Sequence, residues 1–224
     1  MTAGSWLTRA LSVGQSAPIA VAILVAANLV PLIGVLWFGW DVGMILITYW
    51  LENGIVGLLN VFKILLATGE RSPAAVRGRG RYGIAAFFGV HYGLFWVVHG
   101  VFVLLLTGRG IARGVLDPLG IVFSEPALVL AAAALLTSHA ASFWLNFIGR
   151  REYLATSVDS QMWQPYPRMF VLHITIVLGG VFLIGQGQPI FALALLVVLK
   201  TAIDLFLHLR EHRRAQSALP TLMT

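Results

Sequence analysis

The chain has 224 residues, of which 58% are hydrophobic and 11% are charged, whereas soluble domains carry about 25% charged residues. This composition excludes a soluble globular domain and indicates an all-α, polytopic bundle of membrane helices. The lack of cysteine in the sequence excludes disulfides, cysteine-ligated iron–sulfur clusters and thiolate metal sites. The net charge of +6 does not indicate a nucleic-acid partner, because membrane topology accounts for the positions of the arginines.

Six apolar segments are long enough to cross a bilayer, which takes about 20 residues. They are predicted as spans over residues 18–38, 42–66, 83–107, 126–147, 168–186 and 188–210. Between them, residues 108–125 are expected to hold a short interfacial helix, and residues 149–167 are expected to lie along the membrane surface. We expect residues 1–224 to form a single transmembrane domain.

The arginines alternate between the predicted loops as the positive-inside rule requires. Those on one side are Arg9, Arg71, Arg77, Arg79, Arg81, Arg150, Arg151, Arg168, Arg210, Arg213 and Arg214. The opposite side has Arg109 and Arg113 alone. This bias predicts six spans with both termini in the cytoplasm.

Ionisable side chains are concentrated inside the predicted spans. They are His91, His99, His139, His173, His208, Glu52, Asp204 and Lys200. Each costs roughly 2.5–3.5 kcal/mol to insert into the bilayer, so such residues are rare unless they have a function or a partner. The concentration of imidazoles and carboxylates therefore indicates a site within the membrane.

Counting a rise of about 1.5 Å per residue from the cytoplasmic ends places these residues at two depths. An inner group at roughly 8–12 Å comprises Asn60, His91, His139, His173 and Asp204. An outer group at roughly 20–24 Å comprises Glu52, Asn53 and His99. Helical spacing adds a stripe of Lys200, Asp204 and His208 on the last span and a stripe of His139, Ser142 and Asn146 on the fourth.

The first hypothesis is an intramembrane metal-dependent hydrolase that acts on a lipid or another membrane-embedded substrate. His91, His139 and His173 would bind the metal together with Asp204 or His208, and three histidines with an open position are typical of catalytic zinc. Acid–base roles are expected for Glu52, His99 and Asp204. Contacts with the substrate are expected from Asn60, Ser142, Asn146 and Lys200.

Two alternatives stay open beside the hydrolase. Bis-histidine ligation of haem b in an electron-transfer protein would use His91 and His139, which have similar predicted depths. A transporter of protons or metal ions would use Glu52, His99, Asp204 and His208 as a relay. For any single residue, a hydrogen bond that only joins two helices is the competing interpretation.

Two short motifs carry less weight. The H-x-x-E-H pattern from His208 to His212 resembles that of inverted zinc proteases. Those enzymes need a further acidic ligand downstream, and none of the twelve residues after His212 is acidic. The spacing of Gly89 and Gly93 permits close helix packing or a homodimer. The expected partners are therefore the lipid bilayer, a lipid substrate and a second copy of the chain.

Several sequence blocks resemble an uncharacterised family of bacterial six-span membrane proteins. They are residues 49–53 (YWLEN), 88–93 (FGVHYG), 146–153 (NFIGRREY) and 204–212 (DLFLHLREH). The resemblance implies a location in the bacterial inner membrane and supplies no activity. The set of three histidines, an aspartate and a serine is also similar to that of the alkaline ceramidase and adiponectin-receptor hydrolases, which have seven spans and different motif spacings.

Overall fold

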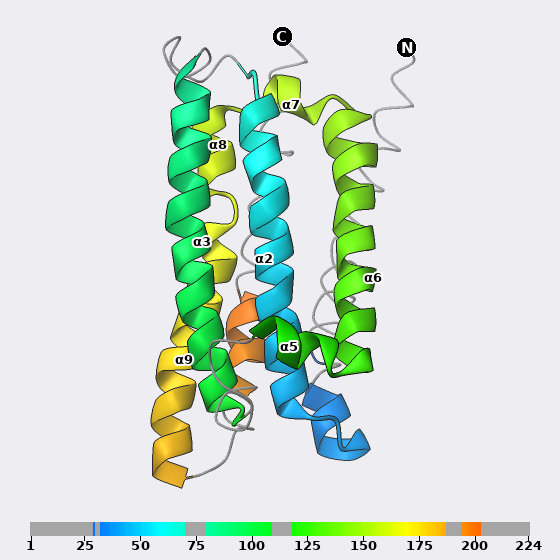
Figure 1. Ribbon diagram of the computed structural model, residues 1–224, viewed down its shortest axis with the longest axis vertical. Helices are drawn as coiled ribbons and strands as arrows, with labels where there is room; N and C mark the ends of the chain where they lie inside the picture. The colour runs from blue at the N-terminus through cyan, green and yellow to red at the C-terminus, as the bar shows by residue number, and fades with distance from the viewer. Residues whose placement is uncertain (1–28, 30–31, 70–78, 109–117, 187–193, 203–224) are drawn as a thin grey trace, which may run out of the picture. The chain divides into compact units, whose positions relative to one another are not determined.

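The computed structural model describes residues 29, 32–69, 79–108, 118–186 and 194–202. All regular elements in these ranges are helices (Figure 1), which confirms the predicted all-α class. The chain divides into two compact units, Asp41–Leu193 on the one hand and Met1–Trp40 with Ala194–Thr224 on the other. In the second unit, residues 32–38 and 194–202 are helical, and the rest of the first and last predicted spans lies outside the described residues.

Three helices of the first unit are long and apolar enough to cross a membrane. They are α2 (Val42–Leu66), α3 (Arg81–Leu106) and α6 (Pro126–Ser142), which continues as the π-helix η2 (Phe143–Ile148). Their lengths of 25, 26 and 23 residues correspond to roughly 35–39 Å of helix. The predicted bounds 42–66, 83–107 and 126–147 therefore agree with the observed helices to within two residues.

Local chemistry sets where these helices begin. The carboxylate of Asp41 accepts a hydrogen bond from the backbone N–H of Met44 at 2.8 Å and so caps the first turn of α2. Pro126 occupies the first turn of α6, where a missing N–H costs nothing. The loop between α3 and α6 contains the short helix α5 (Pro118–Phe123), as expected from its sequence.

A pair of tryptophans fixes the register of α2 against α3, which run antiparallel (Figure 1). Trp50 and Trp96 stack with their ring centroids 4.6 Å apart and their planes at 4°. Each indole N–H donates to the backbone carbonyl of the other residue, at 2.8 and 2.9 Å. Gly54 and Gly100 leave the space for the indoles, because a Cβ there would come within 2.7 and 2.5 Å of the rings.

The segment after η2 enters the bundle and does not stay along its end. It contains α7 (Glu152–Ala155), α8 (Val158–Trp163) and α9 (Tyr166–Gln186). Near the end of α2, the N–H of Gly69 donates to the carbonyl of Thr156 at 3.0 Å. Further along, the Asn60 amide donates to the carbonyl of Gln161 at 3.0 Å. Residues 156–161 thus run beside α2 toward the middle of its length. Helix α9 starts after the helix break at Gln164 and Pro165.

Apolar packing explains why α8 lies inside the bundle. Val158 of α8 is fully buried among Ile64, Phe88 and Met169, which come from α2, α3 and α9. Burying such a side chain contributes about 1.5–3 kcal/mol. The expectation that residues 149–167 lie along the surface is therefore wrong for α8, whose apolar residues pack against α2 and α3.

Candidate functional site

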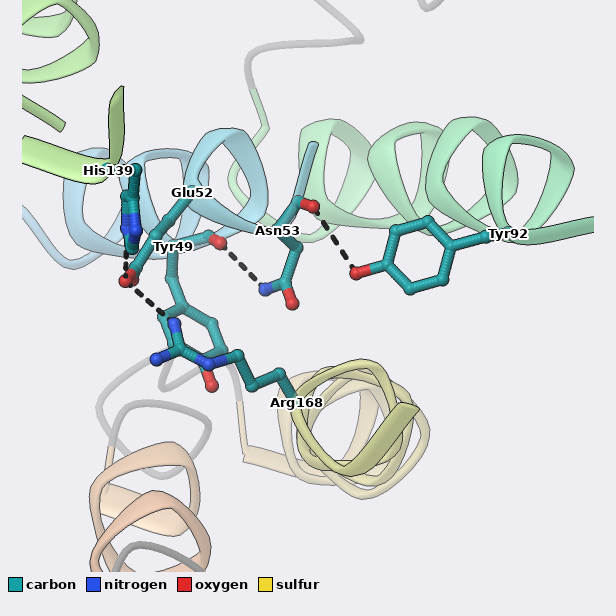
Figure 2. Close-up of polar contacts among 6 residues, drawn as sticks. All are labelled: Tyr49, Glu52, Asn53, Tyr92, His139 and Arg168. Atoms are coloured by element: carbon teal, nitrogen blue, oxygen red, sulfur yellow. Dashed lines mark hydrogen bonds and ion pairs between the residues drawn. The ribbon is translucent and has the colours of Figure 1, made fainter. Parts of the chain in front are cut away.

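The carboxylate of Glu52 joins three helices of the first unit. Its Oε1 atom lies 3.2 Å from Nε2 of His139 on α6 and 2.9 Å from Nη1 of Arg168 on α9 (Figure 2). The side chains of Glu52, His139 and Arg168 are 15%, 25% and 40% exposed. Glu52 is therefore the most enclosed of the three groups and forms the centre of the network.

Hydrogen-bond chemistry assigns the protons in this network. Arginine stays protonated in proteins, so Arg168 donates and the paired Glu52 is an ionised acceptor. His139 must then carry its proton on Nε2 to donate to the carboxylate. Its Nδ1 atom is the position at which a further proton would join the ring. With His139 neutral, the three side chains carry no net charge.

Two further histidines form a directly bonded pair between α3 and α9. Nδ1 of His99 lies 2.6 Å from the carbonyl oxygen of Phe95, and its Nε2 lies 3.0 Å from Nδ1 of His173. A carbonyl only accepts, so Nδ1 of His99 carries the proton and Nε2 accepts from Nδ1–H of His173. His99 is buried and His173 is exposed, so the pair extends from the interior of the bundle to its surface.

The first two turns of α9 supply partners to all of these groups. Tyr166, Arg168 and His173 contact His91, Glu52 and His99, respectively. The hydroxyl of Tyr166 lies 3.0 Å from Nδ1 of His91. Helix α9 is thus the element that assembles the polar side chains of α2 and α3.

The register of α2 and α3 shows which groups share a depth. Gly54 faces Trp96 and Gly100 faces Trp50, so Glu52, midway between Trp50 and Gly54, lies level with the segment 96–100 that contains His99. We use the term polar layer for the group formed at this level by these two residues and their partners. The polar layer consists of Glu52, His99, His139, Arg168 and His173.

The predicted grouping by depth is partly wrong. Glu52 and His99 lie at one level as expected, but His139 and His173 join them and do not join His91. For His173 the reason is that α8 occupies the inner part of the bundle, so that α9 begins deeper than a span starting at the membrane face. His91 lies about two turns away from His99 along α3 and contacts Tyr166.

The predicted metal ligands do not form a cluster in the described part of the chain. No group of three or more histidine, aspartate or glutamate side chains placed to hold a metal ion occurs among the described residues. His91, His139 and His173 lie in three separate contacts. Asp204 and His208 lie outside the described residues, so zinc binding that involves them stays a prediction.

The predicted substrate contacts also have local partners. Asn60 is buried and exchanges hydrogen bonds with Gln161. The amide of Asn146 donates to the hydroxyl of Ser142 at 3.2 Å on the same continuous helix. Lys200 lies half-buried in the segment 194–202 of the second unit. The interpretation of Asn60 as a helix-to-helix contact is thus the simpler one.

Asn53 is the polar residue of this region whose bonds are incomplete. It is 1% exposed, its Nδ2 donates to the carbonyl of Tyr49 at 2.9 Å, and its own carbonyl accepts from the hydroxyl of Tyr92 at 3.2 Å. Its side-chain oxygen Oδ1 has no hydrogen-bond partner among the described residues. In Figure 2 this oxygen points to the side of α2 on which Arg168 and α9 lie.

Sequence reasoning missed two members of the site. Arg168 was assigned to a cytoplasmic loop by the positive-inside pattern, and Tyr166 was assigned to the membrane surface. The signal that distinguishes Arg168 is its place just after Pro165 and Pro167, because proline favours the first turn of a helix. An arginine at that point enters the bundle with the helix.

Comparisons with known proteins extend over nearly the whole chain but supply no activity. A family model described as "Family of unknown function (DUF6498)" matches residues 11–221. No curated protein and no solved structure matches the chain.

Proposed function

Because the chain belongs to this family of unknown function (DUF6498), its own geometry must supply the function, and we propose that it is a membrane protein that transports protons. This is the transport alternative among the hypotheses from the sequence. The observation that carries the proposal is the Glu52 carboxylate shared by Arg168 and His139. The zinc-dependent hydrolase and the haem protein lack comparable support in the described contacts.

The shared carboxylate of Glu52 favours proton uptake because it stabilises the protonated, positively charged form of His139. Histidine is the side chain that changes its charge near neutral pH. A proton that joins Nδ1 of His139 creates an imidazolium that is already bonded to Glu52. The carboxylate can then be neutralised by His139, which leaves the charge of Arg168 available to another anion. A site of this kind couples a proton to a change in ion pairing.

The His99–His173 pair supplies a route for the proton. A proton that binds Nε2 of the exposed His173 allows its Nδ1 proton to pass to Nε2 of His99. His173 is then neutral again, and His99 carries protons on both ring nitrogens, bonded to Phe95 and His173. One proton has entered the interior, and no other atom has changed its bonding.

The break between α8 and α9 is a second feature that fits a transporter. Discontinuous helices with ends inside the membrane form the binding sites of many transporters. Non-helical backbone at such depth is tolerated only inside protein or beside water. Here Pro165 at the break is buried, and the neighbouring Gln161 bonds to Asn60 of α2.

The proposal includes six spans with both termini in the cytoplasm of a bacterial inner membrane. Support for six spans comes from α2, α3 and α6 together with the hydropathy of the three remaining segments. The arginine bias supports the orientation. The bias remains when Arg168, which contacts Glu52, is left out of the count. Surrounding lipid is then the immediate partner of the helices.

Proton flux into proteoliposomes tests the function. Vesicles that contain the full chain and an internal pH dye are given a potassium gradient, and valinomycin sets the membrane potential. We expect proton entry above that of protein-free vesicles, a loss of at least tenfold in Glu52→Gln, and no loss in the control Glu152→Gln on α7. Entry equal to that of empty vesicles, or entry that Glu52→Gln leaves unchanged, refutes the proposal. Zinc in the purified protein that is lost in Asp204→Ala would favour the hydrolase.

A further inference from the structure

The His99–His173 pair brings two ring nitrogens together across the contact of α3 with α9. Nε2 of His99 and Nδ1 of His173 lie 3.0 Å apart and are joined by one proton. Two nitrogen ligands of a tetrahedral zinc ion lie about 3.3 Å apart, because each zinc–nitrogen bond is about 2.0–2.1 Å long. A zinc ion therefore fits between the two nitrogens once the rings tilt and separate by about 0.3 Å.

His99 is already held in the form that binds a metal ion. Its Nδ1–H donates to the backbone carbonyl of Phe95 at 2.6 Å, and its ring stacks on the Phe95 ring with the centroids 5.8 Å apart. Histidines that bind metals almost always donate their second ring nitrogen to a carbonyl, a carboxylate or water, which fixes the tautomer and the direction of the ring. The Phe95 carbonyl has this role here, and it leaves the lone pair on Nε2 of His99 directed at His173 of α9.

His173 can supply the second nitrogen by changing its tautomer. It is exposed, whereas His99 is 4% exposed. When the proton on Nδ1 of His173 leaves to water and another proton binds Nε2, the ring stays neutral and Nδ1 gains a free lone pair. No net proton is released in this exchange. On the exposed side of the pair, water can complete the coordination of the ion.

From this arrangement, and given the proposed proton path, we propose that a divalent transition-metal ion such as zinc binds between His99 and His173 and blocks proton transport. The ion takes the place of the proton that His173 donates to His99, so no proton can pass from one ring to the other. The site differs from the predicted zinc centre because it includes neither Asp204 nor His208.

The number of ligands indicates a regulator and not a resident cofactor. Structural and catalytic zinc sites have three or four protein ligands, and no group of three such side chains occurs in the described part of the chain. Two imidazoles therefore hold the ion reversibly. Imidazole nitrogen also selects the ion, because it suits zinc, copper and nickel, whereas magnesium and calcium prefer oxygen ligands.

Nitrogen-15 solid-state NMR of the full chain, labelled at histidine and measured in lipid bilayers with and without zinc chloride, tests the binding. On addition of zinc, we expect the His173 proton to move from Nδ1 to Nε2 and the Nε2 signal of His99 to shift to a metal-bound position. Magnesium chloride is the control and should change neither ring. The comparison changes only the ion, so it does not depend on the folding of a variant. Zinc that leaves either ring unchanged overturns the inference.

Proton entry into vesicles that contain the full chain tests the block. Zinc should reduce the entry to that of protein-free vesicles, and EDTA should restore it. The variant His212→Gln should remain sensitive to zinc, and a loss of sensitivity would place the acting ion at the end of the last predicted span and overturn the inference. Undiminished entry with zinc bound to both rings also overturns it.

The two measurements separate the site from the transport function. Proton entry without zinc, in a protein whose His99 and His173 do not bind zinc, refutes the metal site and leaves the transport function standing. Zinc bound to both rings of a protein that admits no protons even without zinc refutes the transport function, and the proposed block with it.

Discussion

Replacing Arg168 by glutamine is expected to destabilise the folded bundle by about 2 kcal/mol. Breaking a fully buried ion pair from one side costs roughly 3–5 kcal/mol. The side chain of Glu52 is 15% exposed and that of Arg168 is 40% exposed, so partial solvation reduces this cost. Polar contacts between membrane helices contribute about 0.6 kcal/mol on average and up to about 1.7 kcal/mol. The 2.9 Å charged contact belongs at the upper end of that range, with a further cost for the carboxylate left behind.

The double variant distinguishes this interaction from a general loss of packing. When Glu52→Gln is added to Arg168→Gln, the carboxylate that lost its contact with Arg168 is removed as well, so part of the lost stability should return. We expect a coupling energy of about 1–2 kcal/mol, which is the size found for directly contacting residues. Unfolding in mixed micelles with increasing SDS, followed by circular dichroism, measures the free energy of unfolding of each variant. Strict additivity of the two substitutions would show that the contact contributes nothing and would refute this part of the account.

Further substitutions test the packing that positions the polar layer. Gly100→Val should destabilise the bundle by about 1–3 kcal/mol through overpacking and alter tryptophan fluorescence, because a Cβ at Gly100 would lie 2.5 Å from the Trp50 ring. Gly93→Val is the control, since no described atom lies within 4 Å of its added Cβ. Equal effects of the two substitutions would contradict the stacking of Trp50 on Trp96. Asn60→Leu should cost about 1–3 kcal/mol in SDS unfolding, because it removes both hydrogen bonds between Asn60 and Gln161 and leaves the buried carbonyl of Gln161 without the Asn60 donor. The matched change Asn146→Leu removes a bond to Ser142 within the same continuous helix and should cost less than 1 kcal/mol, so a cost as large as that of Asn60→Leu would count against the α2–α8 contact.

Composition and hydropathy were sufficient to predict the long helices α2, α3, α6 and α9 of the first unit but not the short helices α7 and α8. The apolar run 42–66 coincides with α2 because Asp41 caps its start and the apolar run stops at Leu66. The shared level of Glu52 and His99 could also be predicted, because α2 and α3 are consecutive spans whose depth can be counted from both ends. The segment from 42 to 106 therefore carries most of its structural information locally.

The partners contributed by α9 could not be predicted in the same way. The depth count assumed that every span starts at the membrane face, whereas burial of Val158 places α8 inside the bundle and shifts the start of α9. The arginine rule assigned Arg168 to the loop because it counts charge and ignores the long-range contact with Glu52. Pairings such as His99–His173 depend on this tertiary packing and have no signal in hydropathy.

The central claim is that the polar layer takes up a proton on His139 while Glu52 remains ionised. Nitrogen-15 solid-state NMR of the full chain in lipid bilayers, labelled at histidine, observes the protonation of each ring nitrogen. At high pH we expect His139 to carry its proton on Nε2 and His99 to carry its proton on Nδ1. On acidification His139 should gain a proton on Nδ1, and this signal should disappear in His139→Gln. If His139 gains no proton over the pH range in which the protein stays folded, the account is contradicted.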